Sequence, residues 1–313
     1  MTEANAGSLF HYTPQIDVFL KILEKGIRYS YSAEEFDNDV IFAYEDGGKP
    51  HLCRLVEDAN TPRVIAMPMV SFCDIPLSRT AKHRLKYGKY CIGLDKTTFL
   101  KHWKGKISPV TYYPNHEFRD YFILLADMLD KVGNFDRTAL SDYCRLLTKG
   151  KSVIEGAAEL NKDAIARAYI SQESDFSKLK CFSTQVLAVT KPLVSSKGAA
   201  NYDEREWRAY TMDGLNGDDW GKWEVLERDN NKDKVSLLNN ILTVEKRAYI
   251  RIKASLIPKV ISYIIVSKEN EKKTIIDYLS DNNNKVFGES LTENQRMILI
   301  SKITSFERIR KDY

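Results

Sequence analysis

The stretch that decides the fold is IAMPMVSFCDIPLSRTAKHRLKYGKYCIGL, which occupies residues 65–94. Its first part is apolar and punctuated by proline, which predicts one bent strand, or two short strands, ending near Cys73. Residues 78–87 then predict a helix, which Gly88 ends. Residues 89–94 return to the pattern of a strand. This alternation of strand and helix indicates a core in which helices pack on a sheet.

The N-terminal part also predicts a strand followed by a helix that a glycine ends. Residues 9–12 predict a short strand, and Thr13 is expected as the N-cap of the helix that follows, because Pro14 suits the first helical turn. Gly26 is expected to end that helix. The polar, acidic residues 33–62 are expected to form a loop or a lid over the core.

The rest of the chain adds helices and then more strands. Residues 117–177 predict a helical insertion, while residues 204–212 and 260–266 predict strands, the last of them nearly all apolar and therefore central in a sheet. Strands, helices and strands in this order favour the α+β class. We expect one domain over residues 1–313, with a C-terminal extension over about 268–313.

Composition excludes several classes of protein. The chain has 313 residues, 43% of them hydrophobic, and a net charge of +4. No window is apolar enough to span a bilayer, and the N-terminus lacks the pattern of a signal peptide. The cysteines and histidines show no metal-ligand spacing, so no metal is expected. We therefore expect a cytoplasmic protein with reduced thiols and no membrane partner.

One stretch is strongly basic and rich in aromatic residues. Between Arg79 and Lys106 lie nine basic residues and a single acidic one, Asp95. Cations interleaved with aromatic rings can hold a phosphate chain and stack its bases. The alternative is an ordinary solvated surface. The residues predicted to contact nucleic acid are Arg79, Lys82, Arg84, Lys86 and Lys89.

Three short features are candidates for chemistry, because none of the standard nucleotide, protease or hydrolase motifs is present. His11 lies where a strand meets a helix, a position suited to a phosphate or ribose. Ser71 is a polar residue at the end of an apolar strand. In the third, strand alternation places Glu204, Glu206 and Arg208 on one face. Two carboxylates so close repel unless a cation lies near, and the alternative is a solvent face with local Glu–Arg pairing.

Four segments carry a resemblance to a known family. They are LFHYTPQIDVFLKILEKGI at residues 9–27, the stretch at 65–94, NYDEREWRAY at 201–210, and ISYIIV at 261–266. Together they resemble the AbiGi family of abortive phage-infection proteins, whose members have been labelled antitoxins. The resemblance covers about residues 9–115 and 178–267.

A more distant resemblance concerns mechanism. The early His-Tyr-Thr, the strand serine and the late Glu-x-Glu resemble ADP-ribosyltransferases, including toxins of the DarT type. That resemblance implies a split β-sheet core that binds NAD as co-substrate. It implies Glu206 as the catalytic carboxylate, with Glu204 as its partner. The residues assigned to NAD are His11, Tyr12, Thr13, Ser71 and either Tyr87 or Tyr90.

The predicted function follows from both resemblances. The first hypothesis is a mono-ADP-ribosyltransferase toxin of an abortive-infection system, which modifies RNA or single-stranded DNA and is paired with a cognate antitoxin. The second is a non-catalytic antitoxin that neutralises a partner. The third is an NAD glycohydrolase, with water as the acceptor. The carboxylate would stabilise an oxocarbenium-like state in either enzyme.

Overall fold

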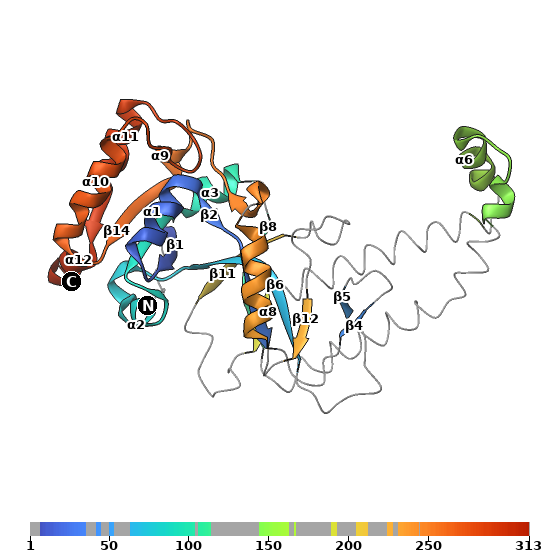
Figure 1. Ribbon diagram of the computed structural model, residues 1–313, viewed down its shortest axis with the longest axis horizontal. Coiled ribbons are helices and arrows are strands. Elements are labelled where there is room, and N and C mark those ends of the chain that lie inside the picture. The colour runs from blue at the N-terminus through green and yellow to red at the C-terminus, as the bar shows by residue number, and fades with distance from the viewer. Residues whose placement is uncertain are drawn as a thin grey trace.

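The structure is a computed structural model, shown in Figure 1. It describes residues 7–35, 42–44, 50–52, 63–103, 106–113, 144–162, 166, 189–192, 205–211, 224–227, 231–243 and 245–312. The strands are β1 (Ser8–Thr13), β2 (Ile27–Arg28), β3 (Ser30–Glu35), β4 (Phe42–Tyr44), β5 (Pro50–Leu52), β6 (Arg63–Cys73), β7 (Tyr90–Asp95), β8 (Lys106–Pro109), β9 (Thr111–Tyr113), β10 (Thr190–Pro192), β11 (Glu206–Tyr210), β12 (Glu224–Glu227), β13 (Tyr249–Ile250), β14 (Ile261–Val266) and β15 (Ile303–Ser305). The helices are α1 (Ile16–Lys25), η1 (Leu77–Arg79), α2 (Ala81–Tyr87), α3 (Lys96–His102), α6 (Val153–Lys162), α8 (Lys232–Leu242), η4 (Lys246–Ala248), α9 (Ile257–Val260), η5 (Glu269–Glu271), α10 (Lys272–Ser280), α11 (Glu293–Ile300) and α12 (Phe306–Asp312).

The long strand β6 organises the largest sheet. Its first half pairs with β3 on one edge and with β12 on the other, and its second half pairs with β11 on the β12 edge. On the β3 edge, β1 pairs with β6 only at Cys73, whose partner on β1 is Phe10. Because the ladder to β3 ends at Met69, β1 and β3 diverge from each other along residues 70–72 of β6. This fork opens one edge of β6 in the middle of the sheet.

The other half of the sheet extends from β1 through β7 and β14 to β15. The predicted strand over 260–266 is β14, and its central position is confirmed because it pairs with β7 on one side and with β15 on the other. Figure 1 shows the C-terminal helices α10, α11 and α12 gathered beside β14. The sheet mixes parallel and antiparallel pairs.

Side-chain alternation divides the core between the two faces of this half. Leu9, Ile92 and Ile264 belong to the main hydrophobic cluster, together with Phe19 and Leu23 of α1. Their immediate neighbours Phe10, Cys91 and Ile265 form a second, smaller cluster with Phe306 of α12. Successive residues of a strand point to opposite faces, so both faces of the sheet are covered.

The glycines predicted to end helices do so. Gly26 follows α1 with φ 97° and donates to the carbonyl of Ile22 at 2.9 Å, and Gly88 follows α2 with φ 127°. The predicted capping role of Thr13 is wrong. Gln15 occupies the N-cap position of α1, and Thr13 is the last residue of β1, where it is buried opposite Tyr90.

The remaining elements correct or complete the prediction. The apolar stretch ending at Cys73 is one strand, β6, and the expected loop over 33–62 contains the end of β3 and the β4–β5 hairpin. Within the expected insertion over 117–177, the structure describes residues 144–162, which include α6, and residue 166; the other residues of the insertion lie outside the described part.

The chain thus has a mixed α/β fold built on a mostly open central sheet. This agrees with the coarse class that the sequence predicted. The finer expectations of an ADP-ribosyltransferase-like core, of a single domain over 1–313 and of an extension over 268–313 stay predictions.

Candidate ligand-binding site

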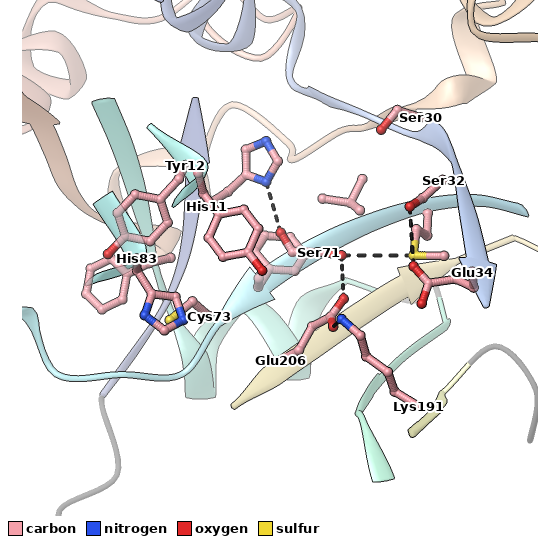
Figure 2. A pocket seen from close by; sticks show the side chains of 15 residues that line it. His11, Tyr12, Ser30, Ser32, Glu34, Ser71, Cys73, His83, Lys191 and Glu206 are labelled. Atoms are coloured by element: carbon pink, nitrogen blue, oxygen red, sulfur yellow. Dashed lines mark hydrogen bonds and ion pairs between the residues drawn. The ribbon is translucent and has the colours of Figure 1, made fainter. Parts of the chain in front are cut away.

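A cavity of about 320 Å³ lies at the fork of β1, β3 and β6, as Figure 2 shows. Register explains its polar wall. Ser30 lies opposite Met69, and Arg208 lies opposite Ser71, so these side chains project from the same face of the sheet. Alternation brings to that face the residues Ser30, Ser32, Glu34, Ser71, Cys73, Glu206 and Arg208. Helix α2 adds His83 and Tyr87 to the lining.

A network of buried charges underlies this wall. Arg208 is fully buried, and its guanidinium bonds Glu206 at 2.8 Å and Glu34 at 2.7 Å. Glu206 also accepts a hydrogen bond from the Ser71 hydroxyl at 2.6 Å and pairs with Lys191 at 3.3 Å. Among the described residues, the network therefore pairs two carboxylates with two cations.

This environment fixes the charge of Glu206. Burial alone raises the pKa of its carboxyl, but the charges of Arg208 and then Lys191 oppose burial and lower that pKa to about 2. Burial lowers the pKa of the Arg208 guanidinium, and Glu34 and Glu206 reverse this and raise it above its usual value. Both groups are ionised at neutral pH, and they form an ion pair with each other.

His11 projects from β1 into the fork. Its Nδ1 lies 3.0 Å from the carbonyl oxygen of Ser71, at a residue where β6 has no ladder partner on that edge. Burial lowers the pKa of the imidazole, and the hydrogen bond to Ser71 opposes that shift. A neutral ring that donates through Nδ1 keeps Nε2 as a hydrogen-bond acceptor.

The structure gathers most of the residues singled out from the sequence. The cavity is lined by His11, Tyr12, Ser71, Tyr87 and Glu206. Thr13 and Tyr90 do not line it: the Tyr90 hydroxyl donates to Glu271 at 2.7 Å, and its ring stacks on Phe19. Glu204 lies outside the described residues.

The predicted nucleic-acid surface is divided between exposed and engaged side chains. Arg79, Lys86 and Lys89 are exposed, and the ammonium groups of the two lysines lie over the rings of Tyr87 and Tyr90. Arg84 lies over the ring of Phe306 at 4.8 Å, which docks α2 on α12. The side chain of Lys82 lies outside the described part. Lys96, farther along the basic stretch, bonds Asp74 at 2.6 Å.

Sequence reasoning missed Glu34 and Lys191. Glu34 could have been predicted from the sequence. Tyr31 and Ala33 alternate with Ser30, Ser32 and Glu34, which is the pattern of a strand with one buried face. Lys191 had no such signal. It lies on the three-residue strand β10, which reaches the site by pairing with β9.

Comparison with known proteins gives one result. Residues 60–267 match the model of a family described as "Putative abortive phage resistance protein AbiGi, antitoxin". This match covers most of the chain, from just before β6 to just after β14. The chain belongs to the AbiGi family. No curated protein and no solved structure matches it.

Membership of the AbiGi family corrects the predicted function. The family is described as an antitoxin, so the prediction of an NAD-dependent ADP-ribosyltransferase toxin is wrong, and so is the assignment of enzyme activity. The geometry offers a physical reason. The carboxylate oxygens of Glu206 are bonded by Arg208, Lys191 and Ser71. A carboxylate that stabilises a developing cation needs an oxygen directed at that cation.

The described residues give no sign of a membrane span or a metal site. None of their helices is both long and apolar enough to cross a bilayer. Nor do the described histidines, cysteines and carboxylates form a group of three with the proximity that a metal ion needs.

Proposed function

We propose that this AbiGi protein is the antitoxin of an abortive-infection system and neutralises a partner toxin by binding it. The observation that carries the proposal is the family match, which spans the strands β6 and β11 of the charge network. The network itself supports a non-catalytic role, because its charged groups are paired with one another.

The face of α2 has the character of a protein-binding surface. Leu85 of α2 is 88% exposed, the highest value among the exposed large apolar side chains of the described residues. Residues 75–94 contain no aspartate or glutamate. An exposed apolar centre with a cationic rim is complementary to an acidic partner surface with an apolar side chain at its middle. We place the contact with the toxin on this face.

The experiment mixes the purified chain with the purified toxin of its abortive-infection system. We expect a complex in size-exclusion chromatography with light scattering, and an affinity that falls as salt rises. Reversing Arg79, Lys86 and Lys89 to glutamate should weaken the complex at least about tenfold, because rim charges set long-range attraction.

A matched control makes the charge change at three other exposed lysines, Lys232, Lys253 and Lys259. It should leave the affinity within about twofold. Absence of any complex would contradict neutralisation by binding. If the α2 variant keeps its affinity for the toxin but loses RNA, this face serves nucleic acid, as the sequence predicted, and the proposed toxin contact is wrong.

A further inference from the structure

We propose that the junction of α2 and α12 binds a dianionic phosphate group between the guanidinium groups of Arg84 and Arg310. Inorganic phosphate and the terminal phosphate of an RNA strand are two sources of that group. The inference goes beyond the proposed function, because it concerns a ligand of the free chain and does not require a toxin. Arg79, Lys86 and Lys89, which the toxin contact uses, are not part of the site.

Phe306 of α12 brings the two arginines together. The guanidinium of Arg84 lies 4.8 Å from the centroid of the Phe306 ring. Arg310 follows four residues after Phe306, and its Nε donates to the Phe306 carbonyl oxygen at 3.4 Å. Side chains four residues apart lie on the same face of a helix, so Arg310 projects from the side of α12 that packs on α2. Figure 1 shows these two helices near each other, although they are far apart in the sequence.

The charges of this pair are not balanced within the described part of the chain. Burial, and then the charge of Arg310, lower the pKa of the Arg84 guanidinium, and Tyr12 opposes this shift to a smaller extent. The Nε of Arg84 is buried and has no hydrogen-bond partner among the described residues. Nor does either guanidinium form an ion pair with a described carboxylate. Two like charges held together repel, and an anion between them removes the repulsion.

The carboxylate of Glu307, on the same helix as Arg310, is already occupied. Glu307 pairs with Lys311 at 3.3 Å through Oε1, and its Oε2 accepts the backbone N–H of Glu269 at 3.1 Å. Residues 75–94, which include all of α2, contain no aspartate or glutamate. The side chain of Asp312 lies outside the described part. The described carboxylates therefore leave the two arginines to an anion from outside the chain.

Geometry and charge favour phosphate as that anion. A guanidinium is a planar fork whose N–H groups match pairs of phosphate or carboxylate oxygens. Two guanidinium groups need more acceptors and more charge than a single carboxylate carries. A phosphate monoester has three free oxygens and a charge of about −1.5 to −2 at neutral pH, so one group engages both arginines. A phosphodiester inside a strand has a single charge and matches the pair less well.

Phosphorus NMR titration of the purified chain with inorganic phosphate, at constant pH and ionic strength, tests the site. We expect Arg310→Gln to weaken phosphate binding at least about tenfold, because it removes a charged hydrogen-bond donor. The matched control is Arg308→Gln, at an exposed arginine of the same helix whose charge acts on Glu269. It should leave the affinity within about twofold. Arg84→Lys keeps the charge near Phe306 but loses the planar fork, and it should also weaken binding.

Two RNA oligonucleotides identify the source of the phosphate. A short oligouridylate with a 5′-phosphate and its 5′-hydroxyl counterpart are titrated into the wild type in competition with inorganic phosphate. Displacement by the 5′-phosphorylated strand alone supports the site and assigns the RNA terminus as a source, and displacement by neither strand supports free phosphate as the ligand.

Three results would overturn the inference. They are no binding of phosphate to the wild type, equal losses of affinity in Arg308→Gln and Arg310→Gln, and equal displacement by the two strands, which would make the backbone the ligand. None of these results bears on toxin neutralisation, which is measured with the toxin itself.

Discussion

At the scale of single residues, Arg208 is the group on which the site depends. It is fully buried between Glu206 and Glu34, and removing its charge takes the ion pair with Arg208 from both carboxylates and leaves Lys191 paired with Glu206. Arg208→Gln should lower the free energy of unfolding by about 3–5 kcal/mol. Lys191→Gln removes one ion pair at 3.3 Å from a side chain that is 19% exposed, and should cost less than Arg208→Gln. Urea denaturation of both variants measures the difference, and equal losses would show that Arg208 has no special role.

Glu206 makes the stability of this region depend on pH. Its pKa in the folded protein is about 2, below the value of 4.5 expected for an unperturbed glutamate. A depressed pKa means that the carboxylate stabilises the fold fully above about pH 4.5 and loses this effect as the pH falls towards 2. The melting temperature of wild type should therefore fall more steeply below pH 4.5 than that of Glu206→Gln. Parallel curves for the two proteins would rule out the paired carboxylate.

At the scale of elements, the turn after α2 holds the helix against β1. A Cβ at Gly88 would collide with the backbone of Thr13, and φ is 127°. Gly150 has φ 76° and open space around it, so Gly150→Ala carries only the conformational cost, about 1 kcal/mol. Gly88→Ala should cost at least about 2 kcal/mol. Thermal melts compare them, and a smaller loss for Gly88→Ala would mean that the α2–β1 contact is loose.

The elements also show what could be predicted from sequence. The strand ending at Cys73 and the helix ending at Gly88 were predictable, because apolar runs and glycines are local signals. The shared face of Glu206 and Arg208 followed from alternation within one strand, but their pairing was only the alternative to a catalytic role and was expected at a solvent face, whereas it is buried. The fork was not predictable. It arises because two distant strands share one edge of β6 and part at Ser71, and no local pattern encodes long-range register.

At the scale of the whole molecule, the central claim is that this AbiGi chain neutralises a toxin and is not itself toxic. The most direct measurement is bacterial growth with the chain and its partner toxin expressed under separate inducers. Our account predicts arrest with the toxin alone, normal growth with the chain alone, and restored growth with both. Arrest by the chain alone, relieved by Glu206→Gln, would contradict the account and return Glu206 to a catalytic role.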